Sequence, residues 1–243
     1  MTDTPTDDHR RDQLAANLDA VRRRVAAACD EAGRDPGEVS LVVVTKFFPA
    51  SDVRLLADLG ITDVGENRHQ EAEAKAAECG DLGLRWHFIG GLQSNKAGSV
   101  ASYADVVESV DRIKLVAPLS RGAHSRSHDL DVLLQVSLDP PGAHHRSGAD
   151  PGDLDALARA VTEAGMLRLR GLMAVAPLPS AGGLTPEEAF ARLAEIREDF
   201  VAEHPDATVL SAGMSADLEA AVARGATHVR VGSAVLGPRP SVQ

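Results

Sequence analysis

A lysine directly follows a short apolar run, and this position favours chemistry at its amine. Leu41 to Val44 are four branched apolar residues, typical of a buried strand, and Thr45 and Lys46 come next. Partial burial disfavours an ammonium ion, so it lowers the pKa of a lysine and frees an amine that can attack a carbonyl carbon. The alternative is a lysine whose stem packs along the strand end while its ammonium group reaches water.

A glycine-containing segment near the C-terminus predicts an anion site. The run "SAGMS" covers Ser211 to Ser215 and precedes a helical pattern. Gly213 permits a tight turn, after which the amides of Met214 and Ser215 are expected to point outward at a helix N-terminus, where anions bind. The alternative is an ordinary glycine turn with Ser215 as the helix cap.

A second segment of this kind, "VRVGS", covers Val229 to Ser233 and ends the next strand-like run. Gly232 lets a ligand approach the backbone, and Ser233 adds a hydroxyl donor. Arg230 offers a positive charge, although strand alternation equally allows it to point into the protein interior. The segment is again open to a simpler interpretation as a glycine turn.

The elements that position these residues alternate along the chain. Strand-like runs are separated by amphipathic helical patterns, which predicts a single eight-fold β/α barrel, with a doubly wound open sheet as the alternative. The reactive residues of such a barrel follow the carboxyl ends of its strands. The eight predicted strands are Leu41–Val44, Ile61–Val64, Leu84–Ile89, Ala104–Glu108, Asp131–Leu138, Leu167–Met173, Ala207–Leu210 and Thr227–Val231.

Capping residues mark where several helices are expected to begin. Thr185 to Glu188, "TPEE", has the pattern of a capping box with proline in the first turn. Ser51, Asp111 and Asp150 are also predicted caps, the last because Pro151 follows it. An additional amphipathic helix precedes the barrel and carries apolar residues from Leu14 to Val25.

The domain organisation is expected to be simple. Residues 1–9 are polar and predict a disordered start, and residues 10–243 predict one barrel domain, because no linker-like change in composition divides them. The loosest internal segment is the loop Pro140 to Asp150.

Composition excludes some classes of protein. The 243 residues carry a formal net charge of −11, and no basic run exceeds Arg22, Arg23 and Arg24, which argues against nucleic-acid binding. No apolar run approaches the roughly 20 residues that cross a membrane, and the polar start does not resemble a signal peptide. Two isolated cysteines predict reduced thiols, and we expect a cytoplasmic protein.

A strand-end lysine and a phosphate site in one barrel mouth together suggest a ligand that carries an aldehyde and a phosphate. Pyridoxal 5′-phosphate (PLP) has both groups. A sugar-phosphate aldolase that uses a Schiff-base lysine needs the same two features, so these residues alone leave both candidates open.

Longer stretches carry a family resemblance. They are "VVVTKFFP", "VGENRHQE", "WHFIGGLQSNK", "ESVDR", "RGLMAVAP", "LSAGMSADLEAAV" and "VRVGSAVLG", which run from about residue 40 to residue 237. In these stretches the chain resembles the family of PLP homeostasis proteins that includes the bacterial YggS. The resemblance implies a barrel like the N-terminal domain of alanine racemase and a non-catalytic role in holding, buffering or delivering PLP, with PLP-dependent apoenzymes as candidate recipients.

The resemblance also assigns residues. It implies that Lys46 forms the reversible Schiff base and that Asn67, in the "GEN" motif, lies close to the cofactor ring. It places Arg230 near the cofactor, and His87 is either a pocket or a core residue. The phosphate-binding motifs then fall on Ser211, Gly213, Met214, Ser215, Gly232 and Ser233.

An amino-acid racemase or another PLP enzyme of low activity is the alternative function. A two-base racemase needs a second acid or base, which in alanine racemase is a tyrosine from a further domain. The only tyrosine here is Tyr103, which we expect at the opposite end of the barrel. An aldolase needs an acid near its lysine, and Glu66 is the one obvious carboxylate among the strand-end residues.

The remaining expectations concern metals and assembly. His124, His128, His144 and His145 match no ligand spacing, so we expect no metal. Arg146 and Gly148 resemble a short family element of a basic residue and a glycine. We expect a monomer.

Overall fold

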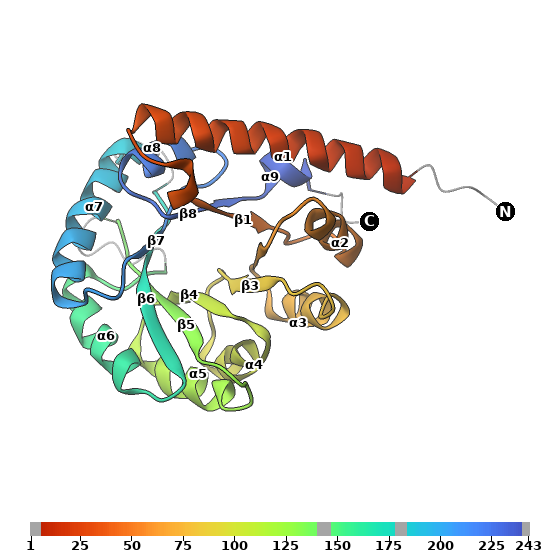
Figure 1. The fold of residues 1–243 in the computed structure, drawn as a ribbon. Coiled ribbons are helices and arrows are strands. Elements are labelled where there is room, and N and C mark those ends of the chain that lie inside the picture. The colour runs from red at the N-terminus through yellow and green to blue at the C-terminus, as the bar shows by residue number, and fades with distance from the viewer. Residues whose placement is uncertain (1–5, 140–146, 178–183, 240–243) are drawn as a thin grey trace.

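A closed barrel of eight parallel strands forms the centre of the molecule. The computed structural model describes residues 6–139, 147–177 and 184–239. The strands pair in chain order and β8 returns to β1, which confirms the predicted eight-fold barrel (Figure 1). The strands are β1 (Ser40–Val44), β2 (Asp63–Glu66), β3 (Arg85–Phe88), β4 (Val106–Val110), β5 (Leu130–Gln135), β6 (Leu167–Met173), β7 (Val209–Ser211) and β8 (His228–Val231).

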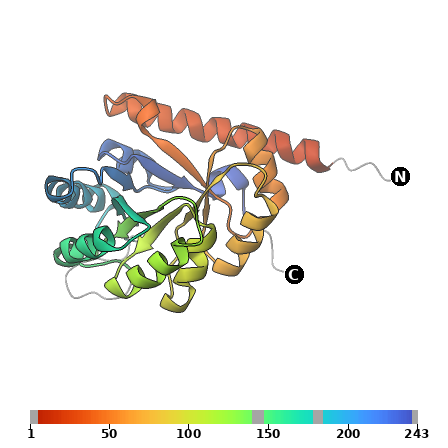
Figure 2. The ribbon, with the colours of Figure 1, turned by 60° about the horizontal axis from the view of Figure 1, so that its bottom comes forward.

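Helices cover the outside of the barrel (Figure 2). They bury apolar residues spaced three and four apart, as in α6, where Leu154, Leu157, Ala158 and Val161 face the strands. The α-helices are α1 (Thr6–Glu31), α2 (Ala50–Asp58), α3 (His69–Glu78), α4 (Ser94–Tyr103), α5 (Val116–Ala123), α6 (Leu154–Glu163), α7 (Pro186–Glu203), α8 (Leu218–Ala223) and α9 (Ser233–Leu236). Three short 3-10 turns are η1 (Pro36–Glu38), η2 (Ile113–Leu115) and η3 (Pro151–Asp153).

Helix α1 lies outside the ring and crosses α8 and α9 (Figure 1). Its buried residues Leu14, Leu18 and Val21 belong to one apolar cluster with residues of α8 and α9. The predicted disordered start is wrong for residues 6–9, because α1 begins at Thr6. Arg10 stabilises these turns through Asp52, with Nη2 2.6 Å from Oδ2.

The helix starts show which capping predictions hold. The capping box is confirmed: Thr185 Oγ1 accepts from the Glu188 amide and the Glu188 carboxylate accepts from the Thr185 amide. Asp150 is confirmed as the residue before the turn at Pro151, although its side chain makes no capping bond. The predicted caps at Ser51 and Asp111 are wrong by one or two residues, because Pro49 precedes α2 and Arg112 precedes η2.

Strand β2 begins and ends two residues later than predicted. Glu66 is therefore the last residue of the strand rather than a residue of the following loop, and it is buried. In the described part of the chain, none of the helices combines the length and the apolar character that crossing a membrane requires.

Candidate functional site

A pocket of about 270 Å³ opens at the carboxyl ends of β1 and β8 and beside the loop after β7. Six of the nine predicted site residues line it: Lys46, Met214, Ser215, Arg230, Gly232 and Ser233. The other lining residues are Val44, Phe47, Phe48, Ile89, Ala216, Gly237 and Arg239. The structure thus brings together a lysine from the first strand and glycine loops from the last two, which lie far away in the sequence.

Lys46 contributes an amine without an acid partner. The residue is half-buried, and burial followed by the positive charge of Arg239 lowers its pKa below the ordinary 10.5. Among the described residues, no carboxylate lies within ion-pair distance of the Lys46 Nζ. An amine in this environment loses its proton more readily than a surface lysine does, so it is the stronger nucleophile near neutral pH.

Two further cations stand at the pocket mouth. The guanidinium groups of Arg68 and Arg239 each lie over the ring of Phe47, 4.8 Å from its centre. Together with Lys46 and Arg230 they make this region positive in a chain whose net charge is −11. An anionic group is therefore attracted to the pocket.

The loop after β7 turns at Gly213. Its φ is +89°, and a Cβ there would lie 2.7 Å from the Cβ of Ala221, so only glycine fits. The Arg230 amide donates to the Gly213 carbonyl over 2.9 Å and ties this turn to β8. Gly213 therefore shapes the loop without lining the pocket.

The helix that follows this loop begins later than predicted. Asp217, and not Ser215, precedes α8, and the Met214 amide donates to Asp217 Oδ1 over 2.6 Å. The expectation that the Met214 amide points freely outward is therefore wrong, because a carboxylate of the same loop already accepts from it. Ser215 and Ala216 remain at the pocket wall.

The loop after β8 approaches β1 closely. A Cβ at Gly232 would lie 3.2 Å from the Val44 carbonyl oxygen, so a larger residue would press against the strand that carries Lys46. Helix α9 begins directly afterwards, at Ser233. The first amides of a helix have no acceptor within it, so this turn presents donors beside the exposed Ser233 hydroxyl.

Arg230 lies at the inner wall of the pocket, and hydrogen bonds to groups of the barrel interior fix its guanidinium group. It is buried, and it donates to Ser211 Oγ over 2.7 Å and to the Ala174 carbonyl over 2.8 Å. Ser211 in turn donates to Glu108 Oε2 over 2.6 Å. Because β4 and β7 are not neighbours, this last bond crosses the barrel interior. Ser211 thus holds Arg230 and does not itself line the pocket.

The interior network continues from Glu108 to His87. The His87 ring lies 2.7 Å from Glu108 Oε1 and 2.9 Å from Asp63 Oδ1. Burial opposes the charges, but the hydrogen bonds outweigh it: the pKa of His87 is raised, and that of Glu108 falls to about 2, with Arg230 contributing. His87 is therefore a core residue of a buried ion network.

Asn67 lies beside the pocket rather than at its wall. It follows β2 and packs against Gly90, where a Cβ would lie 2.1 Å from the Asn67 carbonyl oxygen. Of the other predicted positions, His144, His145 and Arg146 lie outside the described residues. Gly148 is described, and a Cβ there would lie 2.7 Å from the Ser137 amide nitrogen. Within the described ranges, no group of three or more His, Cys, Asp or Glu side chains is arranged so that it could hold a metal ion.

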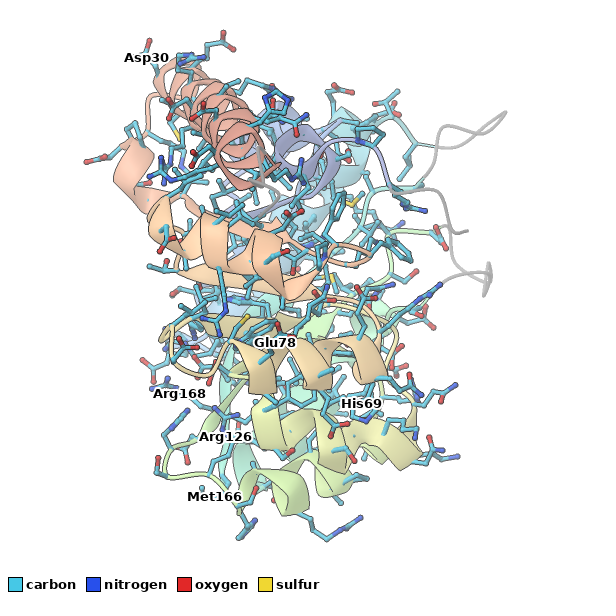
Figure 3. All side chains as sticks on the ribbon, turned by 90° about the vertical axis from the view of Figure 1, so that its right-hand side faces the viewer. Asp30, His69, Glu78, Arg126, Met166 and Arg168 are labelled. Carbon is cyan, nitrogen blue, oxygen red and sulfur yellow. The ribbon has the colours of Figure 1, made fainter. Side chains whose placement is uncertain are left out.

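The opposite end of the barrel carries a different set of charges. Asp131 is buried and accepts from Arg85 and Arg168, with the Arg168 Nε 2.6 Å from Oδ1. Arg126 pairs with Asp105 in the same way. Figure 3 shows Arg126 and Arg168 together at the edge of the molecule where strands begin, whereas α3 starts with His69 toward the other side.

Comparison with known proteins identifies the family. Residues 12–240 match the family described as "Alanine racemase, N-terminal domain". The pyridoxal phosphate homeostasis protein of Mycobacterium tuberculosis is 45% identical over 249 residues, which cover 95% of this chain and 94% of that protein. The chain belongs to the pyridoxal phosphate homeostasis protein family. Its counterpart in Pseudomonas aeruginosa is 46% identical over 93% of this chain and 96% of that protein.

A solved structure that is similar to this chain has a ligand. The structure of PipY from Synechococcus elongatus "with PLP bound" is similar to this chain with a TM-score of 0.77 and 37% sequence identity. The similarity covers 92% of this chain and all of PipY. The names of the Mycobacterium tuberculosis and Pseudomonas aeruginosa relatives describe homeostasis and mention no reaction.

Proposed function

We propose that this chain binds PLP as a reversible Schiff base on Lys46, with the phosphate at the loops after β7 and β8, and that it serves PLP homeostasis. The observation that carries the proposal is the arrangement of the pocket. An unpaired lysine amine of lowered pKa shares one cavity with the backbone of Gly232 and Ser233 and with the loop at Ser215. The names of the relatives, and the PLP bound to PipY, support the same ligand.

The residues present fit this cofactor. About 270 Å³ is close to the lower end, roughly 300 Å³, of small-molecule pockets, which suits a compact ligand. Arg230 and Arg239 offer positive charge, and Ser215 and Ser233 offer hydroxyl and backbone donors for a phosphate. Because Asp217 accepts from the Met214 amide, we assign the phosphate to the other donors of these loops.

Bound PLP supplies an aldehyde beside a phosphate-bearing ring. The Lys46 amine adds to the aldehyde carbon, the carbonyl oxygen leaves as one water molecule, and a C=N double bond remains. Addition of water restores the amine and the free aldehyde, so the protein stores a reactive compound and releases it again.

The pocket lining favours holding over turnover. Apart from Lys46, the described residues at its wall include no carboxylate, imidazole, phenol or thiol that could move a proton during catalysis. Tyr103 stacks on His69 instead, between α3 and α4. A racemase or another PLP enzyme would need such a group, so we propose a carrier for the cofactor.

The domain organisation, the oligomeric state and the location of the protein are also part of what we propose. We propose one domain from residue 10 to residue 243 that acts as a monomer and passes PLP to apoenzymes. Cys29 and Cys79 are both buried, free thiols, which suits the reducing cytoplasm that we propose as its location.

A binding titration tests the proposal. PLP is added to the wild type, to Lys46→Ala and to Lys114→Ala, the last being an exposed lysine that serves as control. We expect the visible Schiff-base band in the wild type and the control. In Lys46→Ala the band should be absent and Kd roughly 100-fold higher, equivalent to about 2.8 kcal/mol. An unchanged band and Kd in Lys46→Ala would refute the proposal.

A further inference from the structure

A buried lysine and two glutamates lie between the barrel wall and helix α3, directly behind the end of β1. Lys75 Nζ is 2.7 Å from Glu66 Oε1 and 2.7 Å from Glu71 Oε1. The side chains of Lys75 and Glu66 are 8% and 1% exposed. We call these three residues the α3 clamp.

The α3 clamp contacts the peptide groups on both sides of Lys46. Lys75 Nζ donates to the Thr45 carbonyl over 2.8 Å, and this carbonyl belongs to the peptide bond that precedes Lys46. The Phe47 amide, in the peptide bond that follows Lys46, donates to Glu71 Oε1 over 2.5 Å. The backbone of Lys46 is therefore fixed at both ends by one helix, while its amine reaches the pocket.

The backbone just after Lys46 shows why such anchoring is needed. Phe47 has a φ of +72°, a conformation that a bulky residue rarely adopts and that costs about 1–2 kcal/mol. Strained backbone of this kind persists where several contacts determine it together. Here they are the bond to Glu71 and a bond of 3.1 Å from the Phe48 amide to the Thr45 carbonyl.

Lys75 is itself unsuited to react with an aldehyde. An ammonium group has three N–H donors, and those of Lys75 have three oxygen acceptors, on Thr45, Glu66 and Glu71. Lys75 also does not line the pocket. Lys75 and Lys46 thus have separate roles, since the Lys75 ammonium group donates to three oxygen atoms and the Lys46 amine has no carboxylate partner among the described residues.

We propose that the α3 clamp positions Lys46: by fixing both peptide groups around this residue, Lys75 and Glu71 direct its amine to the place where it meets the aldehyde. The proposal rests on the proposed function, because it concerns the same lysine. Lys75 and Glu71 are positioning residues, since they touch neither the amine nor the pocket. Correct orientation of a reacting pair is worth a large factor, and a displacement of 1 Å costs roughly 100-fold in rate.

Glu71→Leu and Glu71→Gln form a matched pair for the test. Glutamine keeps an oxygen that accepts from Phe47 and Lys75, whereas leucine has none. The first readout is the rate at which the visible Schiff-base band appears after mixing with PLP. The second is the Kd of pyridoxine 5′-phosphate, which has the ring and phosphate of PLP but an alcohol in place of the aldehyde.

We expect Glu71→Leu to slow band formation at least roughly 10-fold, while the Kd of pyridoxine 5′-phosphate stays within about twofold. Glu71→Gln should react within about threefold of the wild-type rate. If Glu71→Leu does not fold, as judged by thermal unfolding, Lys75→Met is measured with the same two readouts and carries the same expectation. Exposed Lys114→Met is the control for Lys75→Met and should match the wild type.

Two results would overturn the inference. One is a Glu71→Leu or Lys75→Met variant that reacts at the wild-type rate. The other is a loss of pyridoxine 5′-phosphate affinity as large as the loss of rate, which would mean that the pocket as a whole has changed. Failure of the proposed function is distinct from both, because the wild type itself would then show no band.

Discussion

Both ends of the barrel carry cationic side chains, but the two ends differ in whether these cations are paired with carboxylates. Where the strands begin, Arg85 and Arg168 share the buried carboxylate of Asp131, and Arg126 pairs with Asp105. Where the strands end, Lys46 has no carboxylate within ion-pair distance among the described residues. Paired charges hold the amino end together, whereas the carboxyl end keeps an amine free to react.

The paired charges where the strands begin serve stability, whereas the unpaired amine where they end serves function. An aspartate that accepts from two arginines contributes charge-assisted hydrogen bonds, and its charge is balanced by cations of the protein itself. The protonated form of a half-buried amine beside other cations is disfavoured in the folded protein. More of the amine is therefore neutral, which is the form that reacts with an aldehyde. The comparison also holds for the two lysines near the pocket, because Lys75 is fully paired and Lys46 is not.

The largest change in stability is expected from removing Asp131, the carboxylate that two arginines share at the amino end of the barrel. Asp131→Ala should lower the free energy of unfolding by about 2 kcal/mol, because bonds from Arg85 and Arg168 are lost, and leave the Kd for PLP unchanged. Lys46→Ala should do the reverse and change stability by no more than about 0.5 kcal/mol. Urea unfolding and PLP titration of both variants provide the check. A folded Asp131→Ala variant that no longer binds PLP would show that the amino end of the barrel also serves binding.

A smaller effect concerns the pH dependence of stability, which His87 influences through its hydrogen bonds with Asp63 and Glu108. The pKa of His87 is raised in the folded protein, so His87 stabilises it fully below the ordinary value of 6.5 and less as pH rises through the folded value. The groups that face it are Asp63, Glu108 and His228, with Arg230 and Arg85 farther along.

His87→Gln measures this contribution directly. The difference in unfolding free energy between the wild type and His87→Gln should be largest at acidic pH and shrink on the alkaline side of pH 6.5. Urea unfolding of the unliganded proteins across the pH range gives this difference. A difference in unfolding free energy that is constant with pH, or that grows as pH rises, would show that His87 is not protonated in the folded protein.

The smallest expected effect concerns the pKa of the Lys46 amine. Burial and then Arg239 lower the pKa of Lys46, so the rate of Schiff-base formation should rise with pH around a midpoint below 10.5. Arg239→Gln should move this midpoint upward, and Arg23→Gln, at an exposed site on α1, should leave it in place. Rates measured from neutral to alkaline pH give the midpoints. A midpoint that Arg239→Gln leaves unchanged or lowers would contradict the role of Arg239.

Much of this arrangement follows from local patterns in the sequence. The eight strands were predictable from branched apolar runs between helical patterns, and β6 has the predicted bounds. The capping box at Thr185 was predictable because its two bonds join residues only three apart. The position of Lys46, Gly232 and Ser233 at the pocket wall was predictable because these residues follow the carboxyl ends of barrel strands.

The remainder depends on contacts between distant segments. Nothing local indicates that Arg239 and Arg68 meet over Phe47, since these residues come from three different loops. The positive φ of Phe47 is likewise imposed by Glu71 and is not a preference of phenylalanine. Strand β2 ends two residues later than its apolar pattern suggests, so the burial of Glu66 beside Lys75 appears only in three dimensions.

Chemical trapping identifies the lysine that carries the cofactor. Protein mixed with PLP is reduced with borohydride, which converts the C=N bond to a stable amine, and the labelled peptides are identified by mass spectrometry. The four lysines at positions 46, 75, 96 and 114 are resolved in this way. We predict one label, on Lys46, with Lys75 unlabelled although it lies nearby. A label that falls mainly on another lysine would contradict the account.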